Sequence, residues 1–157
     1  MSKKKILIIS FSQSGQLSDI ISALIDPLFE NGIGDKDISV DTESLCPLKP
    51  FPFPWAALEF VDVFPESLNE IPCRLAPFSF DPDAHYDLII LAYQVWYLAP
   101  SIPITSFLQS PEAARVMKNR PVITLIGCRN MWLQAQEKVK RGILKNQGRL
   151  NAVDLTI

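Results

Sequence analysis

Stretches dominated by bulky apolar residues constrain the fold more than any other feature of the sequence. They span residues 5–11, 86–93 and 121–128, and isoleucine and leucine occur in each of them. A strand with one solvated face alternates apolar and polar residues, whereas a strand buried on both faces does not. These stretches therefore predict interior strands of a parallel sheet.

Segments with helical periodicity lie between the predicted strands. The expected helices cover residues 17–29, residues 130–146 and a short stretch that begins at residues 104–109. Asn31-Gly32 supplies a stop signal for the first helix. Pro27 lies inside the same pattern and lacks the N–H group that a helix needs, so we expect a kink or a break near residues 23–26.

Weaker strand patterns at residues 38–45 and 149–157 complete an alternation of strands and helices. Such alternation predicts an open α/β sheet whose parallel strands are joined by right-handed crossovers. A sheet of this kind carries helices on both faces, and the sequence stops at its fifth predicted strand. We therefore expect residues 1–157 to form a single domain that is truncated at its C-terminus, or one that a second chain covers.

An excursion rich in proline and aromatic residues, at residues 46–84, separates the second predicted strand from the third. The prolines preclude long regular elements, and the aromatic side chains preclude a freely solvated linker. We expect an ordered, packed segment with one short helix near residues 55–64. Exposed aromatic side chains in it would favour a homodimer.

Composition disfavours several functional classes. The formal net charge of −2 gives no basic field for nucleic acid or for a membrane surface. The apolar stretches are too short to span a bilayer, and no secretory signal is recognisable, so we expect a cytoplasmic protein. The 3 cysteines have no metal-binding spacing and His85 is the only histidine, which disfavours zinc sites and histidine-based triads.

Candidate site residues lie in loops that follow predicted strands, because ligands of open α/β sheets bind beyond the carboxyl ends of the strands. In the first loop, Ser12 and Ser14 offer hydroxyl groups, Gly15 allows close backbone approach, and a helix begins directly afterwards. This arrangement suits a phosphate monoester. The loop lacks the lysine of a P-loop and the glycines of a dinucleotide fingerprint. The serines could alternatively serve only as helix caps.

The loops after the third and fourth predicted strands carry aromatic and basic residues. Trp96 and Tyr97 could stack on a large flat ligand, or they could be core or dimer-contact residues. Arg129 could meet an anionic substrate or simply lie at the surface.

Taken together, these loops resemble those of the flavodoxin-like family, which binds FMN. In that family a Ser/Thr-x-Thr-Gly-x-Thr loop wraps the FMN phosphate, and here residues 12–17 read Ser-Gln-Ser-Gly-Gln-Leu, with Leu17 in place of the last hydroxyl. A Ser-Pro-Val-Trp-like stretch flanks the flavin in related reductases, and here Val95 and Trp96 match while Tyr93 and Gln94 depart. The stretch from 127 to 140 is also similar to a longer flavodoxin-fold subgroup, some members of which are associated with dialkylresorcinol biosynthesis.

The resemblance implies a flavodoxin-like sheet with strand order 2-1-3-4-5 that lacks its final helix. It also implies an FMN oxidoreductase that takes electrons from NAD(P)H and passes them to a small organic acceptor, with no assigned catalytic side chain. An electron carrier is one alternative, although such carriers are usually more acidic than this chain. A fold that no longer binds flavin and serves as a binding or assembly module is another. The implied FMN-binding residues are Ser12, Gln13, Ser14, Gly15, Gln16, Leu17, Val95, Trp96, Tyr97 and Arg129.

Overall fold

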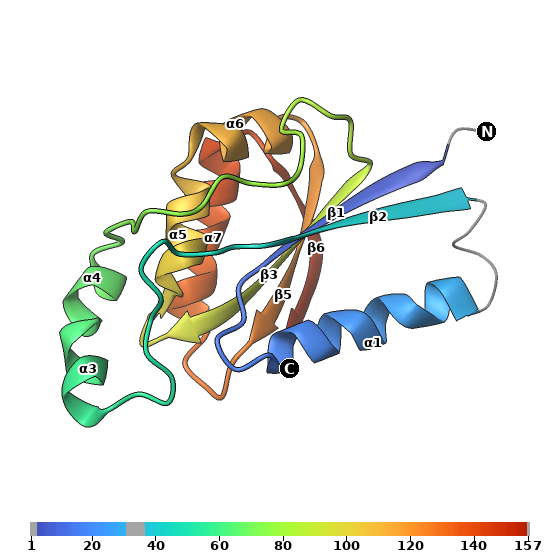
Figure 1. The fold of residues 1–157 in the computed structure, drawn as a ribbon. Coiled ribbons are helices and arrows are strands. Elements are labelled where there is room, and N and C mark those ends of the chain that lie inside the picture. The colour runs from blue at the N-terminus through green and yellow to red at the C-terminus, as the bar shows by residue number, and fades with distance from the viewer. Residues whose placement is uncertain (1–2, 31–36, 157) are drawn as a thin grey trace.

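Parallel strands form the centre of the molecule, which a computed structural model describes for residues 3–30 and 37–156 (Figure 1). The strand order is β2-β1-β3-β5-β6, and the short β4 pairs antiparallel with β3. The elements, in chain order, are β1 (Lys4–Ser10), α1 (Gln16–Glu30), β2 (Ile38–Ser44), α3 (Ala57–Asp62), α4 (Phe64–Leu68), β3 (Leu88–Trp96), β4 (Ala99–Pro100), α5 (Ile102–Leu108), α6 (Pro111–Met117), β5 (Pro121–Gly127), α7 (Leu133–Lys145) and β6 (Arg149–Thr156).

The predicted sheet is confirmed. When β4, which lies off the main path, is left out, β5 and β6 become the fourth and fifth strands, and the order β2-β1-β3-β5-β6 is the predicted 2-1-3-4-5. The helices agree less closely with the sequence analysis. α6 lies where no helix is predicted, and α3 and α4 occupy the region of the single short helix expected in the excursion. The expected helix stop at Asn31-Gly32 lies outside the described residues.

Of the kink or break predicted near residues 23–26, the break is wrong, because α1 continues from Gln16 to Glu30 with Pro27 inside it. A proline inside a helix removes the hydrogen bond to the carbonyl four residues earlier, here that of Ala23. Pro27 stands in the last turn of α1, so a single hydrogen bond is lost and only three residues of the helix lie beyond the proline. The helix therefore accommodates the proline without ending.

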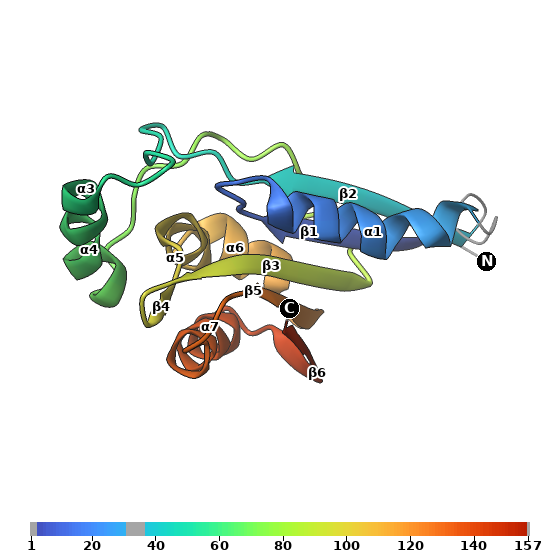
Figure 2. The same ribbon diagram turned by 90° about the horizontal axis from the view of Figure 1, so that it is seen from below.

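Alternation along the strands separates the core into two layers, one on each face of the sheet. Figure 2 shows the sheet and its helices from a second side. Leu7 and Ile9 of β1 join the core under α5, α6 and α7. Ile8, which points to the opposite face, packs with Leu17 and Ile21 of α1. In the described part of the chain, α1 is the only helix on that face, and beside it runs a groove of about 270 Å³ that is lined by aliphatic side chains.

Aromatic contacts anchor the excursion at residues 46–84 to the main core. Phe78 and Phe80 pack against Phe107 of α5, with ring centroids 5.6 Å and 6.4 Å from it. A bridge between Pro47 and Leu75 joins the two arms of the excursion. The expectation of an ordered, packed segment is thus confirmed. None of the helices in the described ranges has the length and hydrophobicity needed to cross a bilayer.

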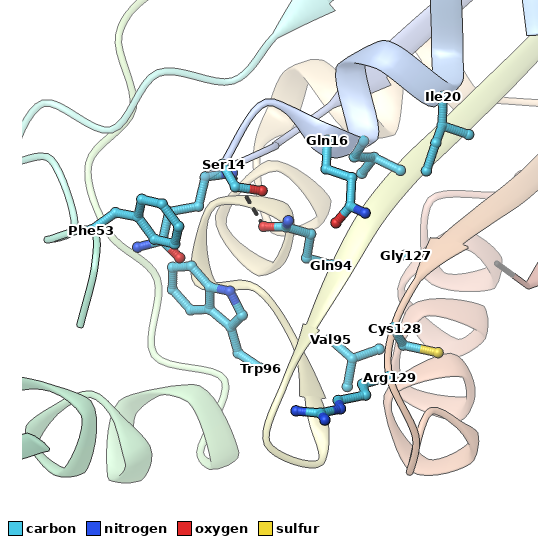
Figure 3. Close-up of a pocket in the computed structure, with 12 residues that line it drawn as sticks. Ser14, Gln16, Ile20, Phe53, Gln94, Val95, Trp96, Gly127, Cys128 and Arg129 are labelled. Atoms are coloured by element: carbon cyan, nitrogen blue, oxygen red, sulfur yellow. Dashed lines mark hydrogen bonds between the residues drawn. The ribbon is translucent and has the colours of Figure 1, made fainter. Parts of the chain in front are cut away.

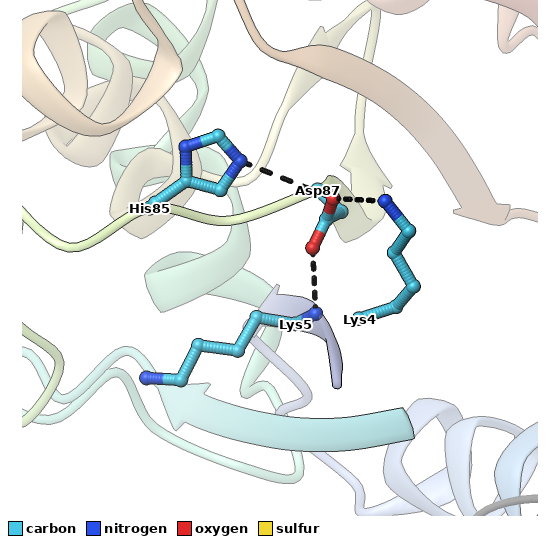
Figure 4. Close-up of polar contacts among 4 residues, drawn as sticks. All are labelled: Lys4, Lys5, His85 and Asp87. Carbon is cyan, nitrogen blue, oxygen red and sulfur yellow. Dashed lines mark hydrogen bonds and ion pairs between the residues drawn. The ribbon is translucent and has the colours of Figure 1, made fainter. Parts of the chain in front are cut away.

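Charged side chains gather where β1 and β3 begin, at the opposite edge of the sheet from the loops singled out in the sequence (Figure 4). Asp87 accepts hydrogen bonds from Lys4 Nζ at 2.8 Å and from the Lys5 backbone N–H at 2.9 Å. These two bonds hold the pKa of the Asp87 carboxyl below its usual value. His85 Nε2 lies 3.9 Å from the same carboxylate. The cluster ties the start of β1 to the segment that enters β3.

We expect the free energy of unfolding to depend on the ionisation of Tyr86 at alkaline pH. Its buried phenol donates a hydrogen bond to Asp41 at 3.1 Å, and burial, followed by this bond, raises the pKa of Tyr86 to about 12. In the unfolded chain the pKa is about 10, so unfolding is favoured once the unfolded phenol ionises. We expect a stabilisation that is complete below pH ~10 and lost towards pH ~12. Urea titrations across this range should show the loss, and Tyr86→Phe should remove that part of the pH dependence.

Candidate functional site

The loops at the carboxyl ends of β1, β3 and β5 enclose a pocket of about 510 Å³ (Figure 3). Its position agrees with the rule for open α/β sheets, and its volume is typical of small-molecule sites. Gln94 of β3 and Gly127 of β5 are paired in the sheet and lie at its floor. The lining residues are Gln13, Ser14, Gln16, Leu17, Ile20, Phe53, Gln94, Val95, Trp96, Gly127, Cys128 and Arg129.

Backbone N–H groups without partners mark the turn between β1 and α1. Gly15 adopts a φ of +85°, a left-handed conformation that favours glycine, and no atom lies within 4 Å of the position that a Cβ would take there. Among the hydrogen bonds of the described residues, none uses the N–H groups of Ser14, Gly15 or Gln16. An exposed turn of this kind at the start of a 15-residue helix is suited to an anion.

Ser12 and Leu17 have structural roles in this turn. Ser12 Oγ accepts a hydrogen bond from the Leu17 N–H at 3.2 Å, so it caps the start of α1. The Leu17 side chain is buried, and its Cδ1 would lie 3.4 Å from a Cβ added at Gly127. Leu17 thus closes the floor of the pocket with an apolar side chain, and Ser12 is not among the lining residues.

The residues that depart from the flavodoxin-like pattern in β3 are accommodated. Tyr93 is fully buried on the α7 side of the sheet, where its hydroxyl donates to Gln136 Oε1 at 2.6 Å, and it does not line the pocket. Gln94 does line the pocket, and its Oε1 accepts a hydrogen bond from the Gln13 N–H at 3.2 Å. The Gln94 side chain therefore connects the end of β3 to the β1–α1 loop.

Trp96 and Tyr97 are neighbours in sequence but lie in different surroundings. Trp96 lines the pocket while remaining only 8% exposed. Tyr97 adopts a φ of 59°, and its ring packs edge-on against Phe64 of α4 with centroids 4.4 Å apart. Burial raises the pKa of Tyr97. The structure thus brings Val95 and Trp96 to the pocket and leaves Tyr97 outside the set of lining residues.

Arg129 gives the pocket its positive charge. It follows β5 beside Cys128, across the pocket from Phe53 in Figure 3. Burial raises the pKa of the Cys128 thiol, which keeps it neutral near pH 7. Within the described chain, Arg129 is the one charged side chain among the lining residues, and no carboxylate opposes it there. The charge of the pocket therefore favours an anionic ligand.

Phe53 and Ile20 line the pocket although neither is predicted from the sequence as a site residue. Ile20 lies on the apolar face of α1, where helical periodicity indicates core packing and not a ligand contact. Phe53 belongs to the excursion, in which many aromatic residues occur and no periodicity distinguishes the one that faces the pocket. The density of aromatic residues was the only available signal for Phe53.

Solved structures provide the matches to this chain. No protein-family model and no curated protein matches the sequence. A flavoprotein from Lactobacillus acidophilus in complex with FMN superposes with a TM-score of 0.68 at 15% identity, over 98% of this chain and 92% of that one. A protein from Bacteroides eggerthii that is described as a flavoprotein gives 0.65 at 18% identity, over 97% and 91%. Flavodoxin 1 from Bacillus cereus gives 0.59 at 11% identity, over 98% and 84%. At these identities the likeness establishes a flavodoxin-like fold.

Proposed function

We propose that this protein binds FMN at the carboxyl edge of its sheet and transfers electrons from NAD(P)H to a small organic acceptor. The observation that carries the proposal is the pocket between the ends of β1, β3 and β5, which has unpaired N–H groups at the β1–α1 turn. A flavodoxin-like neighbour in complex with FMN supports the choice of cofactor. FMN, when bound, supplies the hydride and electron chemistry, so the chain needs to bind and orient its reactants.

The β1–α1 turn fits the phosphate group. The N–H groups of Ser14, Gly15 and Gln16 and the Ser14 hydroxyl would donate to phosphate oxygens, and the N-terminal end of α1 favours negative charge. No lysine is required, since charge-assisted hydrogen bonds from backbone amides bind phosphate in many proteins. Ser12 would act indirectly, by capping the helix that presents these groups.

The remaining lining residues fit the ring system. Val95, Leu17 and Ile20 provide apolar walls, while the amide side chains of Gln16 and Gln94 provide donors and acceptors for the polar edge of a heteroaromatic ring. Arg129 lies beyond β5 and would attract the negatively charged acceptor or the anionic edge of the ligand. In this arrangement no side chain acts as a nucleophile.

Titration of the purified apoprotein with FMN is the direct test. Micromolar binding, with a visible flavin spectrum, is the expected result, and oxidation of NAD(P)H with a quinone or dye acceptor should follow. Binding without NAD(P)H oxidation would favour an electron carrier. A colourless protein that takes up no added FMN would contradict the proposal and leave a binding or assembly module.

Arg129→Gln is expected to weaken the use of anionic acceptors selectively. The side chain is exposed, so removing its charge should raise the KM for an anionic acceptor by roughly fivefold, the effect of about 1 kcal/mol. A neutral acceptor should be unaffected, and added salt should diminish the difference. Steady-state kinetics with a charged and a neutral quinone test this. Arg141→Gln is the matched control, because Arg141 is an exposed arginine on α7 that pairs with Glu70.

A further inference from the structure

A second cavity, of about 520 Å³, lies between residues 73–82 of the excursion and the helices α5 and α6. This part of the excursion passes over α5 on its way to β3 (Figure 1). The space, here called the excursion cavity, is about as large as the pocket at the carboxyl edge of the sheet, and its volume is typical of small-molecule sites. Over the described ranges, the two cavities share no lining residue.

Apolar side chains form the inner wall of the excursion cavity. Phe78 stacks on Phe80, with ring centroids 5.4 Å apart and an interplanar angle of 23°. Phe80 is buried, whereas Phe78 and Leu75 are only half-buried and line the cavity, so part of their apolar surface remains in contact with solvent. A ligand with an aromatic or aliphatic body would remove this surface from water, which is favourable in proportion to the area that it covers.

Carboxylates outnumber cations at the outer edge of the excursion cavity. Arg115 lines the cavity and donates hydrogen bonds to both carboxylate oxygens of Asp83, from Nε at 2.8 Å and from Nη2. The hydrogen bond to Asp83, followed by the charges of Asp83, Glu112 and Asp81, raises the pKa of the Arg115 guanidinium, so three carboxylates lie near this one cation. Because Asp83 already compensates Arg115, the other two carboxylates give this edge a net negative charge.

Hydrogen bonds hold the wall of the excursion cavity in place on both sides of Phe78. The Cys73 N–H donates to Ser106 Oγ of α5 at 2.8 Å. The Ser79 N–H donates to the buried Glu43 carboxylate of β2, also at 2.8 Å. A wall that is fixed before a ligand arrives loses little conformational freedom on binding, which favours affinity.

We propose that the excursion cavity binds a small organic cation, whose aromatic or aliphatic body packs against Phe78 and Leu75 and whose ammonium group lies beside Glu112. This site goes beyond the proposed function, because it uses neither FMN nor any residue of the pocket at the carboxyl edge. The two cavities also differ in charge. Arg129 favours an anion in the first, whereas Glu112 and Asp81 favour a cation in the second.

Tryptamine and indole-3-propionate test the proposal, because they share an indole ring and carry opposite charges near neutral pH. In NMR titrations of the isotope-labelled wild type, tryptamine should bind with a dissociation constant below about 1 mM. It should shift the amide signals of Leu75, Phe78 and Glu112. Indole-3-propionate should bind roughly tenfold more weakly, because its carboxylate meets like charge. Equal affinities for the two probes, or shifts confined to the pocket at the carboxyl edge, would overturn the proposal.

Glu112→Gln tests the charged contact. Because Glu112 is exposed, its neutralisation should weaken tryptamine binding by roughly fivefold and leave indole-3-propionate no weaker. Glu137→Gln is the matched control, since Glu137 is an exposed carboxylate on α7 that does not line the excursion cavity, and it should leave both affinities within about twofold. Unchanged tryptamine affinity in a folded Glu112→Gln protein would contradict the assignment.

Added FMN separates this inference from the proposed function. Tryptamine should bind with the same affinity whether or not FMN is present, because the two ligands are assigned to cavities without a common lining residue. Displacement of tryptamine by FMN would place both ligands in one pocket and overturn the inference.

Discussion

Gly15→Val is expected to abolish useful FMN binding, raising the dissociation constant by about hundredfold or more, which corresponds to ~3 kcal/mol. The backbone at Gly15 has a φ of +85°, which costs a residue with a side chain roughly 1–2 kcal/mol and a β-branched residue more. The valine methyl groups would also occupy the open space above the turn. Both effects act on the N–H groups that are proposed to hold the phosphate.

Apoprotein titrations with FMN and riboflavin check this expectation. Riboflavin binding should be affected much less, because it does not use the phosphate turn. Gly15→Asn separates the two effects, since asparagine tolerates positive φ better than valine while still adding a side chain. Thermal unfolding of each variant verifies that the fold persists. A folded Gly15→Val protein with wild-type affinity for FMN would refute the assignment of this turn.

Phe107→Ala is expected to destabilise the protein by about 3–5 kcal/mol. Phe107 is fully buried in α5, and Phe78 and Phe80 both pack against its ring. Truncation would leave a cavity between α5 and the excursion and remove the anchor of that segment. The loss would be a large share of the 5–15 kcal/mol that typically stabilises a domain.

Urea denaturation followed by circular dichroism measures this change. Leu58→Ala serves as the control, because Leu58 on α3 is 87% exposed, and its truncation should alter the free energy of unfolding by less than about 0.5 kcal/mol. If Phe107→Ala cost less than about 1 kcal/mol, then this ring would not be the anchor between α5 and the excursion.

The interior strands could be predicted because a strand that is buried on both faces has a nearly continuous run of apolar residues in the sequence. β1, β3 and β5 all overlap with apolar stretches, although β3 runs three residues past the predicted end at Tyr93, to Trp96. α5 was harder to predict from the sequence. All of its residues are buried, so no alternation of an apolar and a polar helix face indicates where it begins and ends. α6 had a readable signal in Ser110, whose Oγ accepts a hydrogen bond from the Ala113 N–H at the start of the helix, and in Pro111 directly after it.

The site could be predicted in part because its position follows from the strand order. Ser14, the end of β3 and Arg129 do meet at one pocket, whereas Gly15 belongs to the adjoining turn and is not among the lining residues. Local sequence could not show that Tyr97 would turn towards Phe64, since that follows from the change of backbone direction after β3. Local sequence could not single out Phe53 either. Its position depends on hydrogen bonds that Gln13 makes with Pro52 and Trp55, which lie 39 and 42 positions further along the chain.

The single-helix layer beside the sheet has a thermodynamic consequence. Detaching α1 exposes less apolar surface than detaching the layer of α5, α6 and α7, because the core cluster under α1 is the smaller one. We therefore expect α1 to detach from the sheet more readily than the other helices. The turn at Gly15 leads directly into α1, and unwinding of the first residues of α1 would move apart the N–H groups that are proposed to hold the phosphate. Occupancy of the turn and local folding of α1 are thus linked equilibria: a bound anion raises the free energy needed to open this helix.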